Sequence, residues 1–364
     1  MNIAWIIEAL EAVAPPSLQE SYDNAGLLIG SPDDEVNSAL ITLDVTEDVV
    51  SEAIGSSCGL IIAHHPLIFK GIKKIGNRNP VERMVTACIR NNIAVYAIHT
   101  NLDNVPDGVN KVICDKIGVK NQSILEPKMQ QLRKLVTFCP TDHAEKIRQS
   151  IFDAGAGHIG NYDSCSFNID GQGTFRGLQG ANPFVGEAYR IHFENEVRIE
   201  TIFPVFKERQ ILKALLSAHP YEEVAYDVYS LENEYNKVGA GMFGVLESPE
   251  PTHNFLERLK SIFDVKCLRH TRIISDTVQR IAVCGGSGSF LINRAIARNA
   301  DVFITGDIKY HDFFDADGKI LITDIGHFES EQFTTELIRD VLSEKFPTFA
   351  ARISKINTNP VFYL

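Results

Sequence analysis

The 364-residue chain lacks the features that mark several large classes of protein. No apolar run approaches the roughly 18 residues of a membrane-spanning helix, and the N-terminal segment has no basic residues ahead of its apolar stretch, as a secretory signal would. The seven cysteines are odd in number and include no Cys-x-x-Cys pair, which argues against a disulfide framework or a zinc ribbon. We therefore expect a cytoplasmic protein with reduced thiols and no membrane partner.

Positive charge is scarce relative to negative charge. The chain has 35 lysines and arginines against 47 aspartates and glutamates, a formal net charge of −12. Because clustered lysine and arginine drive binding to a nucleic-acid backbone, this balance argues against nucleic acid as the main partner. The 44% of hydrophobic and 23% of charged residues are typical of a globular protein. The length exceeds the usual size of a single core, so we expect two or more domains.

Apolar runs that end abruptly in polar residues recur in the first and last thirds of the chain. They predict buried strands at residues 38–46, 59–66, 93–103 and 320–329. Helical patterns alternate with them, at residues 48–54, 80–91 and 329–342. This alternation predicts an α/β fold with a largely parallel sheet, whose ligands lie beyond the carboxyl ends of the strands.

The middle third has a different pattern. From about Lys134 a strand, a helix, a Gly-rich stretch, a strand, a helix and a strand follow one another. This order predicts a ferredoxin-like α+β domain inserted at 127–237, so that 1–126 and 238–364 form one discontinuous α/β domain. A weak internal repeat, in which 53–65 aligns with 295–307, predicts that this outer domain consists of two related α/β halves facing one cleft.

Histidines and carboxylates gather where the predicted strands end. His64 and His65 follow a short apolar strand, and their imidazoles can face one cleft. Asp103 ends another strand and could bridge two ions, although its segment also fits a capped turn. His327 and Glu331 are four residues apart at the start of a helix, so both project from one face, as two ligands of one metal require. Each pattern taken alone also fits an ordinary turn or helix start.

Together these segments place three imidazoles and two carboxylates at the carboxyl edge of one predicted sheet. Mixed nitrogen and oxygen ligands suit Zn²⁺, Mn²⁺ or Fe²⁺. Five ligands exceed the need of one tetrahedral ion and suit two ions that share a carboxylate. We therefore predict a two-metal site, with zinc as the expected metal and manganese or iron as alternatives.

Other polar residues could assist at this site. His99 could orient a ligand or a substrate, and Asp44 could accept a hydrogen bond from a ligating imidazole. Asp307 and His311 could form an acid/base pair. Each of these residues also fits a structural role. Gly285, Gly286 and Ser287 follow a strand and open a helix, so their backbone N–H groups could receive a phosphate, although such turns are common without any ligand.

Several stretches resemble the NIF-three-like (Ngg-one-interacting-factor-three-like) family, whose bacterial members are catalogued as GTP cyclohydrolase I type 2 homologues. The matching segments are residues 20–30, 42–46, 64–66, 99–104, 305–307 with 310–311, and 326–331. The chain departs from the family at Tyr22, where a tryptophan is frequent, and at Met242, where a basic residue is frequent. The resemblance implies that His64, His65, Asp103, His327 and Glu331 ligate two divalent ions, and that six subunits form a ring. It also implies that the insert, with residues 218–223, is similar to the trimer-forming PII and CutA folds.

Two functional hypotheses follow. The first is a metal-dependent hydrolase that acts on a nucleotide-like substrate, for which the family label suggests GTP ring opening. The second is a metal-binding regulatory or interaction protein, in which the insert drives assembly and the metals are structural. Full coordination of the ions by protein would favour the second hypothesis, and solvent or an anion on the ions would favour the first.

Overall fold

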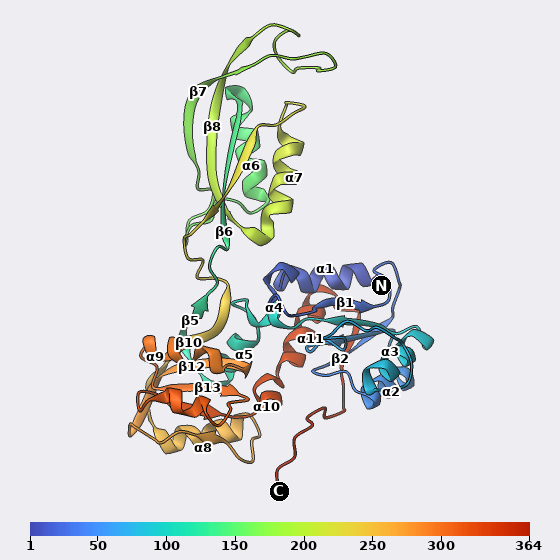
Figure 1. Cartoon of the computed structure of the whole chain (residues 1–364), viewed down its shortest axis with the longest axis vertical. Coiled ribbons are helices and arrows are strands. Elements are labelled where there is room, and N and C mark those ends of the chain that lie inside the picture. Colours follow the sequence, from blue (N-terminus) through green and yellow to red (C-terminus); the bar gives the residue numbers. More distant parts are fainter. The chain divides into compact units, whose positions relative to one another are not determined.

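The computed structural model describes residues 1–364, and the chain divides into two compact units (Figure 1). One unit comprises Met1–Pro127 and Asn236–Leu364, and the other comprises Lys128–Tyr235. The fold is mixed α/β with several sheets. None of its helices combines the length and apolar character that a membrane crossing requires.

The first sheet of the larger unit has five strands. In spatial order they are β1 (Gly26–Ile29), β4 (Ala94–Ala97), β3 (Leu60–Ala63), β2 (Ser38–Thr42) and β15 (Ala350–Ile353). All neighbours are parallel except β1 and β4. The three central strands are buried along their whole length, which explains why β3 and β4 are wholly apolar and β2 has polar residues, Ser38 and Thr42, only at its ends.

Helices cover both faces of this sheet. On one face lie α2 (Glu47–Gly55) and α3 (Pro80–Arg90), which share a core with β2, β3 and β4. On the other face α1 (Ile3–Val13) packs against α11 (Thr334–Lys345), which also contacts β2 and β15 (Figure 1). Local signals set the helix starts: the side chain of Asn79 accepts a hydrogen bond from the N–H of Glu82 at the start of α3, directly before Pro80.

A second sheet corrects the prediction that all four apolar runs share one sheet. Its six strands, in spatial order, are β11 (Arg269–His270), β14 (Leu321–Asp324), β13 (Val302–Gly306), β12 (Thr277–Ser287), β10 (Gly239–Pro251) and β5 (Lys120–Pro127). Only β12, β13 and β14 are mutually parallel. Its helices are α5 (Val109–Ile117), α8 (Thr252–Ile262) and α9 (Ile292–Ala297). The run at 320–329 therefore belongs to this sheet, because strand pairing is a long-range choice that periodicity does not encode.

Both segments of the sequence repeat adopt a helix end, a turn and a parallel strand. Ser57 and Asn299, which are aligned in the repeat, both have positive φ, at 54° and 54°. In each turn the next residue donates its N–H to the alanine five positions earlier. The same turn precedes β4 at Asn92, whose φ is 51°, so this likeness is shared with other helix-to-strand units of the fold.

The predicted helix over 329–342 is two helices. The first, α10, spans His327–Glu331, and α11 begins at Thr334. Gly326 precedes α10 with φ of 95°, a conformation that favours glycine. The first helix therefore starts at His327, where the spacing of His327 and Glu331 placed a helix start, and two residues before the helical pattern at 329–342.

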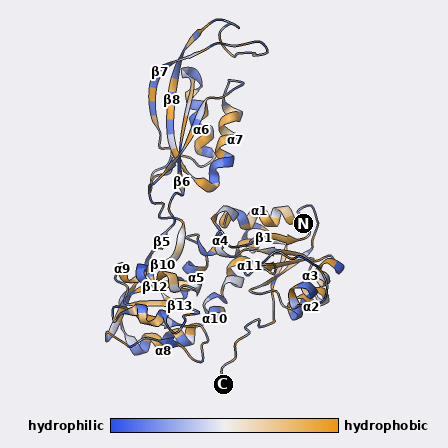
Figure 2. Ribbon diagram, viewed as in Figure 1, coloured by the Kyte–Doolittle hydropathy of each residue, from blue (hydrophilic) through white to orange (hydrophobic).

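The smaller unit is a four-stranded antiparallel sheet with two helices on one face. The strand order is β7 (Phe167–Phe175), β8 (His192–Pro204), β6 (Leu132–Pro140) and β9 (Tyr226–Leu231). The helices α6 (Ala144–Asp153) and α7 (Glu208–Ala218) each bury one side in a core shared with this sheet. Figure 2 shows that both helices carry apolar and hydrophilic residues. Sequence analysis left β7 inside a Gly-rich stretch, because this strand is largely exposed and has no burial pattern to reveal it.

Candidate metal site

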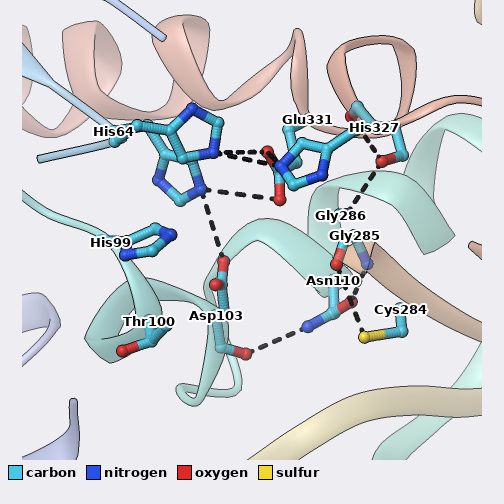
Figure 3. Close-up of polar contacts among 12 residues, drawn as sticks. His64, His99, Thr100, Asp103, Asn110, Cys284, Gly285, Gly286, His327 and Glu331 are labelled. Atoms are coloured by element: carbon cyan, nitrogen blue, oxygen red, sulfur yellow. Dashed lines mark hydrogen bonds and ion pairs between the residues drawn. The ribbon is translucent and has the colours of Figure 1, made fainter. Parts of the chain in front are cut away.

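Three segments of the larger unit bring the predicted ligands together (Figure 3). His64 and His65 follow β3 directly, where their N–H groups continue the parallel pairing with the segment after β2. Asp103 ends the short helix α4 (Thr100–Asp103). His327 and Glu331 are the first and last residues of α10. The predicted ligands thus come from segments next to both sheets of the larger unit and form one cluster.

Each of the four imidazoles in this cluster is held through Nδ1, which donates to an oxygen. The acceptors are Ile98 O for His64 (2.9 Å), Asp44 Oδ1 for His65 (2.8 Å), Asp23 Oδ1 for His99 (2.8 Å) and Asp307 Oδ2 for His327 (2.7 Å). Such contacts fix the tautomer and the orientation of a ring. They leave the Nε2 lone pairs available to a metal ion.

The atoms of one group have the spacing of metal ligands. Nε2 of His65 lies 3.2 Å from Nε2 of His327, and each of these atoms lies 3.1 Å from Oε2 of Glu331. A tetrahedral zinc ion with bonds of about 2.0–2.1 Å separates its ligand atoms by roughly 3.3 Å. The three atoms therefore match one face of such a tetrahedron.

A second group uses the other oxygen of Glu331. Nε2 of His64 lies 3.8 Å from Oε1 of Glu331 and 3.7 Å from Oδ1 of Asp103. Glu331 thus has one oxygen in each group, whereas Asp103 belongs to the His64 group alone. Glu331 therefore lies between the two groups, and a bridging role of Asp103 stays a prediction.

Two atoms of the cluster, His64 Nε2 and Asp103 Oδ1, are buried without a hydrogen-bond partner, and the buried Oε2 of Glu331 has only its ion pairs with His65 and His327. His64 is fully buried, and Glu331 is nearly so. An unsatisfied buried polar atom is costly, and native proteins avoid it unless water, an ion or a ligand fills the site. This buried histidine and glutamate group is one that could hold a metal ion.

The two imidazoles beside Glu331 have raised pKa values. Burial lowers the pKa of His65, but its hydrogen bond to Asp44 and the charge of Glu331 outweigh burial and raise that pKa to about 10. Burial also lowers the pKa of His327, but the neighbouring carboxylates of Glu331 and Asp307 outweigh burial and raise that pKa to about 9. Without a bound ion, both rings are therefore protonated on both nitrogens and positively charged at neutral pH.

The two carboxyl groups shift in opposite directions. Burial raises the pKa of Asp103 well above its usual range, and the charge of Glu331 raises it further. Burial also opposes the ionisation of Glu331, but the neighbouring imidazoles outweigh it and hold that pKa well below its usual range. The negative charge of the cluster is therefore concentrated on Glu331, the residue between the two groups.

The glycine-rich segment predicted as an anion loop serves the cluster in another way. The N–H of Gly285 donates to Asn110 Oδ1 and that of Gly286 to Ser330 Oγ, both at 2.9 Å, so neither is free for a phosphate. The segment including Ser287 is the end of β12. A Cβ at Gly286, whose φ is +62°, would lie 2.3 Å from Oε1 of Glu331. These glycines let the backbone approach the ligand closely.

Two further predicted residues lie apart from each other. Asp307 bonds to His327 and not to His311. His311 is exposed, and its ring packs against Tyr310 and Phe314. Asp307 therefore contacts a predicted ligand, whereas His311 packs among aromatic side chains.

Sequence analysis missed several residues that support the site. Asp23 accepts hydrogen bonds from His99 and from both the N–H and the hydroxyl of Thr100. Burial raises the pKa of Asp23, but these hydrogen bonds outweigh it and lower the pKa to about 2. Asn110 joins the glycine segment to the backbone of Asp103. No local pattern announces these contacts, because 76 positions separate Asp23 from His99.

A cavity of about 770 Å³ opens on the cluster. His65, His99 and His327 lie on its wall together with the aromatic side chains of Phe69 and Phe328. The cavity also contains Asp44, Asp307, Asp324, Glu329, Arg269 and part of the segment 359–363. Two of the ligand candidates, His65 and His327, are thus reachable from solvent by a small molecule.

The model of the family described as Duf34/NIF3 (NGG1p interacting factor 3) matches residues 1–360. The chain belongs to this family. A Bacillus subtilis member named GTP cyclohydrolase 1 type 2 homolog is 36% identical over 369 residues, covering 100% of this chain and 99% of that protein. Among solved DUF34/NIF3 structures, a Bacillus cereus protein related to NIF3 is 39% identical with a TM-score of 0.86, covering 100% of this chain and 99% of that one. A Staphylococcus aureus protein is 31% identical with a TM-score of 0.79 and the same coverage. The fold described above is therefore that of the DUF34/NIF3 family.

Proposed function

We propose that this protein holds two divalent metal ions, zinc in the first place and manganese or iron as alternatives, and that it is a metal-dependent hydrolase. The observation that carries the proposal is the position of Glu331, whose two oxygens face two separate ligand groups. One ion would be held by His65, His327 and Glu331, and the other by His64, Asp103 and Glu331. The unsatisfied buried atoms of the cluster support this assignment.

Bound ions would supply a water of lowered pKa and polarise the bond under attack. The residues of the chain complete the chemistry. His99 lies beside both ligand groups, with its ring centroid 5.3 Å from His64 and 5.2 Å from His65. Because Asp23 holds Nδ1 of His99, its Nε2 is the atom that can carry a proton to or from a substrate. Asp307 orients His327, which makes it a positioning residue.

The loop that follows His65 supports a phosphorylated, nucleotide-like substrate. Residues 64–79 contain no helix or strand, and loops of this length in compact domains are usually functional. The loop lines a second cavity with four cationic side chains, at Lys70, Lys73, Lys74 and Arg78. Phe69 lines both this cavity and the one at the cluster. A nucleotide bound at the metal site could therefore place its phosphates on the cationic side chains of the loop. Phe69 offers a flat apolar surface on which its base could stack. The name of the relatives favours GTP among such substrates.

The smaller unit supports a second proposal, that the protein assembles through its insert into a homohexamer and that a regulatory role accompanies or replaces catalysis. Its chain order is strand, helix, strand, strand, helix, strand, and its sheet order is β9-β6-β8-β7, which is a ferredoxin-like arrangement. Large apolar side chains of its sheet, including Phe167, Ile169 and Phe193, are 44–66% exposed. Such a surface is suited to contact with other copies of the chain.

The cysteines support a cytoplasmic location for the protein, because all seven are unpaired.

The test is a turnover assay on metal-loaded protein with a panel of nucleotides, including GTP, and of phosphodiesters. We expect turnover of at least one nucleotide, with loss of activity in His65→Ala. Lys73→Gln/Lys74→Gln should raise KM for that substrate several-fold, whereas the control pair Lys319→Gln/Lys345→Gln, exposed elsewhere, should not. Absence of turnover, or turnover unchanged in His65→Ala, would refute the hydrolase and leave the regulatory role.

A further inference from the structure

The segment that follows β15 lies along the first sheet and reaches the metal cavity. The N–H of Ser354 donates to Ile41 O at 2.8 Å, and the backbone N–H of Lys355 donates to Glu52 on α2 at 3.1 Å. Beyond these anchors the chain is extended (Figure 1). Two asparagine side chains set its shape: Oδ1 of Asn357 accepts a hydrogen bond from the N–H of Asn359, and Oδ1 of Asn359 accepts one from the N–H of Val361.

Two side chains of this segment bond to residues that support the ligands. The hydroxyl of Thr358 donates to Asp44 Oδ2 at 2.8 Å, while the other oxygen of Asp44 accepts from Nδ1 of His65 at 2.8 Å. Nδ2 of Asn359 donates to Glu329 Oε1 at 2.9 Å, and Glu329 is on α10 between the two ligands of that helix.

The two bonds reach opposite halves of the larger unit. Asp44 follows β2 of the first sheet, and Glu329 belongs to α10, which contacts β12 and β13 of the second sheet. Asn359, Val361 and Tyr363 also line the cavity that opens on the cluster. One short segment therefore touches both sides of the site and forms part of its wall.

We propose that residues 358–363 form a strap across the two halves, in which Thr358 positions His65 through Asp44 and Asn359 positions α10 through Glu329. The inference rests on the proposed metal centre. A carboxylate bonded at both oxygens cannot turn about its last torsion without breaking a contact, so it holds the imidazole in one orientation. When Thr358 is removed, Oδ2 of Asp44 loses this partner, and His65 is free to tilt away from its ion.

The magnitude follows from the behaviour of such supporting contacts. Loss of a partner that orients a metal-ligating histidine typically weakens metal binding by about 10-fold to 100-fold. Thr358→Val keeps the shape of the side chain and removes its hydroxyl, so we expect a loss of about 10-fold in affinity at the His65 ion. Thr358→Ser keeps the hydroxyl and should restore binding.

The experiment titrates Co²⁺ into the chelator-treated full-length chain and follows the d–d absorption bands, which report ligand geometry. Wild type is compared with Thr358→Val, Thr358→Ser, Asn359→Ala and Thr141→Val. The last variant is the matched control, because Thr141 donates a hydroxyl hydrogen bond in the other compact unit. Far-UV circular dichroism and the thermal midpoint in chelator show that each variant is folded.

We expect Thr358→Val and Asn359→Ala to weaken Co²⁺ binding and to shift the absorption bands, with Thr358→Ser and Thr141→Val close to wild type. Identical affinity and spectra for wild type and Thr358→Val would overturn the strap while leaving the metal centre intact. If wild type binds no Co²⁺, the metal centre itself fails and the strap with it. Strap-dependent binding in a protein without turnover would support the strap and refute only the hydrolase.

Discussion

Metal binding at the cluster should release protons, and the structure sets their number. Without an ion, the pKa values of His65 and His327 are about 10 and about 9, so both rings are protonated at pH 7.5. An ion binds only the neutral form of an imidazole. Loading the group of His65, His327 and Glu331 should therefore displace about two protons, and affinity should rise about 100-fold per pH unit between pH 7 and 8.5.

Isothermal titration of the chelator-treated protein with Zn²⁺ measures this release. The heat is recorded at pH 7.5 in buffers of different ionisation enthalpy, and the slope of heat against that enthalpy is the number of protons. The exposed His311, changed to alanine, serves as a control and should leave the slope unaltered. A slope near zero, with affinity independent of pH, would refute the assignment of His65 and His327 as ligands whose protons the ion replaces.

The same shifts set the sign of the pH dependence of stability without metal. A histidine with a raised pKa stabilises the folded state fully below the unfolded value of about 6.5, and this stabilisation is lost as the pH rises through the folded value. For His65 and His327 the window runs from about 6.5 to about 10. The urea midpoint of the chelated protein should fall across this window, whereas that of the metal-loaded protein should not.

Two further predictions concern the surroundings of the ligands. Gly286→Ala should lower the metal content sharply, because the added Cβ would collide with Glu331. The control Gly318→Ala, at a position with a similar φ of +66° and open space around it, should keep its metal and lose only about 1 kcal/mol of unfolding free energy. Elemental analysis and urea unfolding compare the two variants, and equal metal content would contradict the predicted collision. Asp23→Asn should lower the unfolding free energy by about 2 kcal/mol at pH 7, because the pKa of Asp23 falls from 3.8 to about 2 on folding. This stabilisation is present above pH 3.8 and lost as the pH falls through 2, so a difference between wild type and Asp23→Asn that is as large at pH 2 as at pH 7 would contradict it.

Local chemistry explains which elements of the sequence were predictable. The buried parallel strands have apolar centres, and Asn79 with Pro80 marks the start of α3. β7 escaped detection because its residues are exposed, and pairing with β8 rather than burial creates it. The helical pattern at 329–342 begins two residues late because Gly326, with positive φ, sets the first turn of α10.

The candidate ligands were evident from residue type and position, since His64, His65, Asp103, His327 and Glu331 all follow apolar strands or share a helix face. That these residues ligate two ions stays a prediction. Only the tertiary structure showed that two sheets, not one, bring them together, and that Glu331 lies between the two groups.

The supporting contacts were decided entirely by tertiary structure. Asp23 holds His99 across 76 positions, and Thr358 reaches Asp44 across 314. The sequence determined which side chains can bind a metal, because ligand chemistry belongs to the residue itself. It did not determine their spacing or orientation, because these depend on how the two sheets of one compact unit face each other, and no local pattern records that arrangement.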